Sequence, residues 1–351
     1  MGICISTESS AIHGAPEPEE GRDENVIIFE SSNVLCETPR LCSVYSKQGS
    51  KGLNQDAATF LQGFGTKDAA YCGVFDGHGR NGHIVSKIVS KRVFSLILNQ
   101  KDAHSKIDDA LEKGDENILN HVDKVEDDKG PNKNIQEWEE AILSAFRVMD
   151  KEVKLQENID CSCSGTTAVV VIREGEDLVI ANLGDSRAIL GTVSDDEIIP
   201  IQLTTDMKPG LPREADRIRS CNGRVFALKE ESHIQRVWLP NENSPGLAMS
   251  RAFGDFMLKD HGIIAIPDIS YRSLTSSDQF IVLASDGVWD VLSNNEVSSI
   301  VWTADTEKEA AKAVVEAATA TWKNKYPFSK VDDCTVVCLF LQKKRNKTLY
   351  T

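Results

Sequence analysis

The chain of 351 residues and 38.6 kDa is long enough for one large layered domain with short appendages. Its 40% hydrophobic and 26% charged residues are close to globular averages, which excludes a largely disordered or fibrous chain. The net charge of −15 argues against a nucleic-acid-binding protein, because such a protein must neutralise phosphates with an excess of Lys and Arg.

The first six residues carry a lipidation pattern. Met1 to Ser6 fit M-G-x-x-x-[ST], in which Gly2 becomes the myristoyl acceptor after Met1 is removed. One such chain anchors weakly, and a palmitoyl group on Cys4 would supply the second signal that stable anchoring requires. A chance match at a terminus is the alternative.

The sequence also bears on where the protein is located. It has no signal peptide and no apolar run near the ~20 residues of a membrane span. We therefore expect the protein at the cytoplasmic face of the plasma membrane if it is acylated, and otherwise in the cytosol or nucleus.

The composition divides the chain into three parts. Residues 1–39 are rich in Ser, Glu and Pro beyond the lipidation pattern, which predicts a flexible, acylated N-terminal segment. Residues 40–342 are expected to form one folded domain, and residues 343–351 a basic C-terminal tail. Nine cysteines, an odd number without a secretory signal, indicate reduced thiols.

Hydrophobic patterns predict an α+β fold. Helical spacing of apolar residues predicts helices within Val85–Ile97, Trp138–Val153 and Ala311–Trp322, and the charged stretch Asn99–Asn134 is predicted to be a solvated connection. Short apolar runs that follow one another without helices between Thr167 and Leu190 favour antiparallel hairpins covered by helices. The predicted strands are Ala69–Phe75, Thr167–Ile172, Leu178–Asn182, Arg187–Leu190, Phe280–Ala284 and Thr335–Leu341.

Carboxylates stand at the ends of three predicted strands. Asp76-Gly77-His78-Gly79 and Asp286-Gly287 each follow an apolar run, and Asp332-Asp333 precede the last strand. If these ends meet, the repulsion between like charges requires a cation, and all-oxygen ligands suit Mg²⁺ or Mn²⁺. Turn formation is the alternative, since Asp-Gly is a common hairpin dipeptide. Because successive side chains of a strand point to opposite faces, only one of Asp332 and Asp333 can point toward such a cation, and the sequence leaves open which one.

Six segments stand out between about Leu41 and Leu341: Asp76–Gly79, Ser164–Ala168, Asn182–Arg187, Ala248–Asp255, Ser285–Asp290 and Asp332–Val336. In this order they resemble the motifs of the metal-dependent type 2C Ser/Thr protein phosphatases. The Gln55-Asp56 element and the lipidation pattern resemble the plant members of that family.

This resemblance implies a central β-sandwich of two antiparallel sheets flanked by helices, in α-β-β-α layers, with two Mg²⁺ or Mn²⁺ ions at one end. Asp185 and Asp290 resemble positions associated with a looser third ion. The implied ligands are Asp76, which would bridge both ions, the Gly77 carbonyl, Asp286, Asp332, and Asp56 through bound water.

The resemblance also implies hydrolysis of phosphoserine and phosphothreonine on proteins by metal-activated water, without a phosphoenzyme. Because the alkoxide is a poor leaving group, His78 is the candidate that protonates it. Two positions depart from the family pattern: Lys51 stands where many members grip phosphate with Arg, and Gln55 stands where many have Glu. A catalytically weak, membrane-tethered adaptor that binds phosphoproteins is therefore the alternative. In either case we expect a monomer.

Two further segments border this expected site. Lys208 to Pro245 is rich in Arg and in residues that break regular structure, which predicts a flap over the cleft that touches substrate. The small residues of Ser164–Thr167 and Ala248–Asp255 predict scaffolding by close packing rather than direct chemistry.

Overall fold

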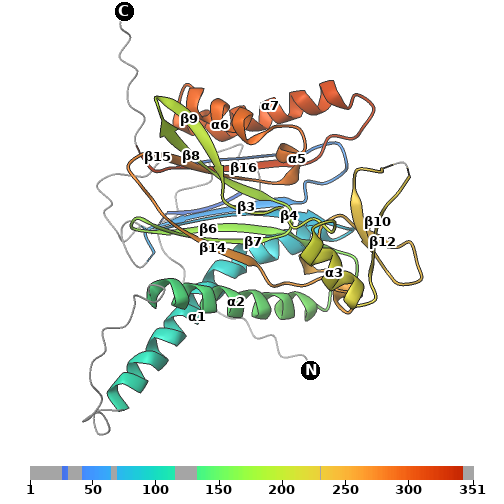
Figure 1. The fold of residues 1–351 in the computed structure, drawn as a ribbon, viewed down its shortest axis with the longest axis horizontal. Coiled ribbons are helices and arrows are strands. Elements are labelled where there is room, and N and C mark those ends of the chain that lie inside the picture. The colour runs from blue at the N-terminus through green and yellow to red at the C-terminus, as the bar shows by residue number, and fades with distance from the viewer. Residues whose placement is uncertain (1–25, 31–41, 65–68, 115–132, 230, 343–351) are drawn as a thin grey trace, which may run out of the picture.

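The computed structural model describes residues 26–30, 42–64, 69–114, 133–229 and 231–342 (Figure 1). Gly2, Cys4 and the 343–351 tail lie outside these ranges. None of the helices within them combines the length and the apolar character that crossing a bilayer needs. The cysteines in the described ranges form no disulfides.

Two sheets pack face to face at the centre of the molecule (Figure 1). The pairing is antiparallel throughout both sheets except between β1 and β3, which are parallel. In pairing order, the first sheet contains β1 (Val26–Glu30), β3 (Asp56–Gln62), β4 (Ala70–His78), β6 (Ala168–Glu174), β7 (Asp177–Leu183) and β14 (Asp268–Ser273). The short strand β5 (Gly165–Thr166) pairs with the end of β4, and β13 (Phe253–Gly254) pairs with β5. The second contains β2 (Cys42–Lys47), β16 (Cys334–Phe340), β15 (Asp278–Ala284), β8 (Arg187–Ser194) and β9 (Glu197–Gln202).

Helices cover the outer face of each sheet, so the layers are α-β-β-α as predicted (Figure 1). Three apolar clusters separate the four layers: one under the helices of the first sheet, one between the sheets, and one under the helices of the second. The first sheet is covered by α1 (Gly82–Gly114) and α2 (Lys133–Lys154), and the second by α5 (Asp286–Trp289), α6 (Asn294–Thr303), the 3₁₀ turn η1 (Glu307–Glu309) and α7 (Ala310–Lys325).

A smaller unit, here called the flap (residues 204–266), projects beside the sandwich (Figure 1). Its own apolar cluster includes Ile218, Val237 and Leu258. The flap contains α3 (Pro212–Ser220), β10 (Arg224–Ala227), β11 (Gln235–Trp238), β12 (Pro245–Leu247), β13 and α4 (Phe256–Lys259).

The predicted strands and helices are all present, and most of their ends are shifted by only a few residues, although α1 continues to Gly114, well beyond the predicted Ile97. Two predictions about connecting segments are wrong in part. Residues 26–30, expected in a flexible lead, form β1 on the edge of the first sheet, because Val-Ile-Ile-Phe is an apolar run suited to a strand. The expected connection 99–134 is helical over 99–114 and from Lys133, because charged residues such as Glu and Lys are good helix formers despite their polarity.

Candidate active site

The first pair of carboxylates comes from adjacent strands. The register of β3 and β4 sets Asp56 directly opposite Asp76. Asp56 is buried, and the hydroxyl of Ser285, which precedes α5, donates to its Oδ2 at 2.7 Å. The main chain of Asp76 is fixed by Thr167, whose amide donates to the Asp76 carbonyl at 2.9 Å. The two sheets therefore meet at this pair.

The second sheet brings Asp286 and Asp332 to the same end. Asp286 is the first residue of α5, directly after β15, and Asp332 precedes β16, which pairs with β15. Asp333 is held differently, since its two oxygens accept hydrogen bonds from the amides of Gly49 at 2.7 Å and Gln55 at 2.8 Å. Asp332 accepts a hydrogen bond from the amide of Asp333 at 3.0 Å and pairs with Lys51, and its charge acts on both Asp76 and Asp286. Asp332 as the metal ligand stays a prediction.

The carboxylates repel one another strongly. Burial and the charges of Asp286, Asp56 and Asp332 raise the pKa of Asp76 well above its usual range. Burial and the charges of Asp185 and Asp332 do the same to the pKa of Asp286. Burial raises the pKa of Asp56 to about 7 although the Ser285 hydrogen bond opposes it. Such a set of groups is stabilised by any cation placed among them.

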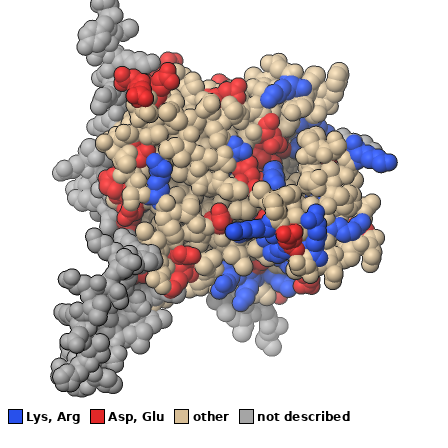
Figure 2. Space-filling model, in the orientation of Figure 1, with Lys and Arg blue, Asp and Glu red and all other residues tan. Residues whose placement is uncertain are grey.

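Two lysines already face these carboxylates. Lys51 forms an ion pair with Asp332, and Lys208 forms one with the buried Asp185. Acidic and basic side chains lie close together between the positions of α5 and α3 in Figure 2. The ammonium group of Lys51 neutralises a carboxylate of the cluster, with half of its side chain exposed, and its role in binding phosphate stays a prediction.

Gly77 and Gln55 lock the loop between β2 and β3 against β4. The amide of Gly77 donates to the Gln55 carbonyl at 3.1 Å, and the Gln55 side chain donates to the Gly79 carbonyl at 2.9 Å. A Cβ on Gly77 would lie 2.4 Å from the Gly82 carbonyl oxygen and 2.5 Å from that of Gln55, so only glycine fits. Gln55 thus has a structural role that the sequence did not reveal.

His78 has a carboxylate partner that sequence analysis missed. Its Nε2 lies 2.6 Å from Oδ2 of Asp255, which is buried and has a positive φ of 52°. Burial lowers the pKa of His78, but the charge and hydrogen bond of Asp255 raise it more. Asp255 was assigned to a scaffolding segment. Nothing in the sequence links these two residues, which are 177 positions apart.

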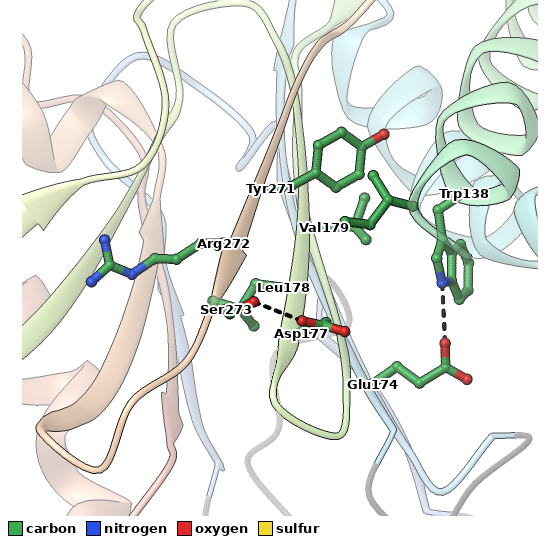
Figure 3. Close-up of a pocket in the computed structure, with 9 residues that line it drawn as sticks. Trp138, Glu174, Asp177, Leu178, Val179, Tyr271, Arg272 and Ser273 are labelled. Atoms are coloured by element: carbon green, nitrogen blue, oxygen red, sulfur yellow. Dashed lines mark hydrogen bonds between the residues drawn. The ribbon is translucent and has the colours of Figure 1, made fainter. Parts of the chain in front are cut away.

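A cavity of about 160 Å³ lies away from the carboxylates, between α2, β7 and β14 (Figure 3). It opens beside Asp177 at the start of β7, whereas Asp185 follows the other end of that strand, about 20 Å away at 3.3 Å per residue. Trp138 donates to Glu174 at 3.1 Å in its wall, and the ammonium group of Lys101 lies 4.0 Å from the centre of the Trp138 ring. None of the predicted site residues lines this cavity.

One buried carboxylate, Glu214 of α3, joins separate segments of the flap to one another. Both oxygens of Glu214, which is 2% exposed, accept hydrogen bonds from Arg217 at 2.7 and 2.8 Å. Arg251 donates to the same oxygens at 2.8 and 3.0 Å, and Ser250 at 2.6 Å. Burial alone would raise the pKa of Glu214, but these hydrogen bonds lower it to about 2.

Glu214→Gln is expected to lower the free energy of unfolding by about 3 kcal/mol at neutral pH, because two arginines lose their buried partner. Denaturant unfolding of parent and variant measures this difference. A folded-state pKa below the unfolded value stabilises only above the unfolded pKa, so the difference should vanish between about pH 5 and pH 2. Asp216→Asn, in an exposed pair of the same helix, should change little. A difference that persists at pH 2 would contradict this account.

The donor set fits a hard divalent cation. Within the described ranges, no three His, Cys, Asp or Glu side chains are grouped closely enough to hold a metal ion as they stand. However, Oδ1 of Asp185 is buried without a hydrogen-bond partner among the described residues, and the oxygens around it are carboxylates with raised pKa values. Oxygen ligands of this kind match Mg²⁺ or Mn²⁺ rather than Zn²⁺.

Residues 42–324 match the sequence profile of the protein phosphatase 2C family. Probable protein phosphatase 2C 72 of Arabidopsis thaliana is 52% identical, covering 98% of this chain and 99% of that protein. Probable protein phosphatase 2C 75 of Oryza sativa subsp. japonica is 44% identical, covering 98% and 83%. The crystal structure of serine-threonine phosphatase 2C from Toxoplasma gondii shares the fold, with a TM-score of 0.69 and 24% identity over 85% of this chain and 94% of that one.

The chain therefore belongs to the protein phosphatase 2C family, close to its plant members, as its motifs predicted. It is a Ser/Thr protein phosphatase of a metal-dependent hydrolase family.

Proposed function

We propose that this phosphatase hydrolyses phosphoserine and phosphothreonine on proteins in one step, without a phosphoenzyme, at the carboxylate cluster between the two sheets. Asp76, the Gly77 carbonyl, Asp286 and Asp332 would hold two Mg²⁺ or Mn²⁺ ions, and Asp56 would act through water. Such ions, when bound, supply a nucleophilic water at neutral pH and positive charge for the phosphoryl oxygens.

The protein's own side chains would orient His78 and protonate the leaving oxygen. Asp255 holds the imidazole of His78, and the proton on that ring would pass to the Ser or Thr oxygen as it leaves. Lys51, released from Asp332, would bind a phosphate oxygen as a point charge.

The observation that carries this proposal is the convergence of three buried carboxylates: the register of β3 and β4 sets Asp56 opposite Asp76, and Asp286 begins α5 at the same end. Burial and neighbouring carboxylates raise the pKa of each of them. Two lysines leave this excess of negative charge only partly compensated. A fold gains nothing from such a cluster by itself, so a cation site is its physical rationale.

Phosphate release from a phosphothreonine peptide across a Mn²⁺ titration tests the proposal. Turnover should rise with Mn²⁺ and disappear with excess chelator. A folded protein that binds Mn²⁺ and phosphopeptide but releases no phosphate would instead support the weak adaptor, for which the Lys51–Asp332 ion pair would be the physical reason.

We also propose that the protein is a monomer held at the cytoplasmic membrane surface by acyl chains on Gly2 and Cys4, where it meets phosphoprotein substrates. The support is the sequence pattern at residues 1–6 alone. Gly2→Ala should shift the protein from the membrane to the soluble fraction of plant cells, because Cys4 palmitoylation alone gives one weak signal. Cys4→Ser is the matched variant with an intact Gly2. Retention of Gly2→Ala on membranes equal to that of the parent would refute the anchor.

A further inference from the structure

Lys208, in the flap, reaches the carboxylate cluster, and the backbone just before it is fixed by several hydrogen bonds. The amide of Met207 donates to the Gly184 carbonyl at 2.9 Å, and Ser250 donates through its amide and hydroxyl to the Met207 carbonyl at 2.7 and 2.8 Å. Arg187 holds Asp206 with two hydrogen bonds. The Lys208 ammonium group is therefore tethered to a well-defined position.

Its partner, Asp185, is an unusual carboxylate. The Asp185 side chain is 0% exposed, Oδ2 forms the ion pair with Lys208, and Oδ1 has no hydrogen-bond partner in the described part of the chain. Asp286 and Asp290 also act on Lys208: burial lowers its pKa, but these charges and that of Asp185 raise it more. The ammonium group thus stabilises several carboxylates at once.

Building on the proposed function, we propose that Lys208 competes with a divalent cation for the carboxylate of Asp185. An ammonium group and a metal ion at one carboxylate repel each other, so binding of the ion must displace the lysine. Because Lys208 lies four residues before α3, metal occupancy at Asp185 and the position of the flap are coupled. Lys208 is thus a positioning residue that lowers the affinity of the metal site at Asp185, the position that resembles the looser third site.

The test measures Mn²⁺ binding rather than turnover. The electron paramagnetic resonance signal of free Mn²⁺ counts the ions bound by the full-length parent, Lys208→Met, and Lys208→Met combined with Asp185→Asn. Lys208→Met should tighten the weakest Mn²⁺ by about tenfold or more, since one positive charge is removed from its surroundings. The double variant should lose that gain, because the carboxylate at issue is gone. Lys229→Met, an exposed lysine of the same flap, is the control and should match the parent.

Thermal unfolding in excess chelator gives the second measurement. Lys208→Met should melt below the parent, since Asp185 loses its buried partner, and adding Asp185→Asn should restore most of the loss. Lys208→Arg keeps the charge and should keep the parent's weak Mn²⁺ affinity, which provides an answer if Lys208→Met does not fold. Equal Mn²⁺ affinities in parent and Lys208→Met would overturn the competition alone. Absence of Mn²⁺ binding by all variants would overturn the proposed metal centre as well.

Discussion

Asp286→Asn is expected to reduce Mn²⁺-dependent phosphate release from a phosphothreonine peptide by about a thousandfold or more. Asp286 begins α5 beside the Asp56–Asp76 pair, and its charge is felt by Asp76 above all other neighbouring charges. Removing it takes a ligand from the proposed ions and several kcal/mol from stabilisation of the transferring phosphoryl group. Phosphate release at saturating peptide across a Mn²⁺ series measures the loss.

The same variant is expected to be more stable than the parent in excess chelator. Asn cannot ionise, so the burial and repulsion that raise the pKa of Asp286 no longer act against folding. Asp305→Asn, exposed after α6, should change neither property. Loss of both activity and metal-free stability in Asp286→Asn would mean that the side chain is needed for the fold, and that the metal role assigned to it is wrong.

Sequence patterns predicted the parts of the fold that rest on local apolar spacing. The runs at Phe280–Ala284 and Thr335–Leu341 became β15 and β16, since buried central strands leave an uninterrupted apolar signal. The flap has no such signal: the strands β10 to β12 are three or four residues long and β10 is only half-buried, so their pairing depends on contacts within the flap. β1 was missed because it is isolated in a polar segment.

The sequence predicted several residues of the site, but not the side chains and amides that they contact. Asp76 and Asp286 were identified by their place next to strands and by family motifs, and the structure brings both to one end of the sandwich. The amides that hold the carboxylate of Asp333 belong to Gly49 and Gln55, nearly 300 residues earlier. Pairs such as His78–Asp255 and Lys208–Asp185 likewise exist only after folding.

His78→Asn is expected to separate two kinds of substrate. With a phosphothreonine peptide the leaving oxygen needs a proton, so turnover should fall by about 10²- to 10³-fold. With p-nitrophenyl phosphate the nitrophenolate leaves without a proton, so the loss should be small. Steady-state kinetics on both substrates at saturating Mn²⁺ measures the ratio of the two losses, which a merely structural defect would not change.

Asp255→Asn extends this argument to the partner of His78. The amide keeps the shape near Gly165, where the carboxylate oxygen lies 2.4 Å from the position of an added Cβ, but it no longer favours the protonated imidazole. Its effect should follow that of His78→Asn: a lower kcat for the peptide, nearly unchanged KM, and little change with p-nitrophenyl phosphate. Equal losses on both substrates would instead assign the His78–Asp255 pair to support of the end of β4, which carries Asp76, Gly77 and His78 in succession.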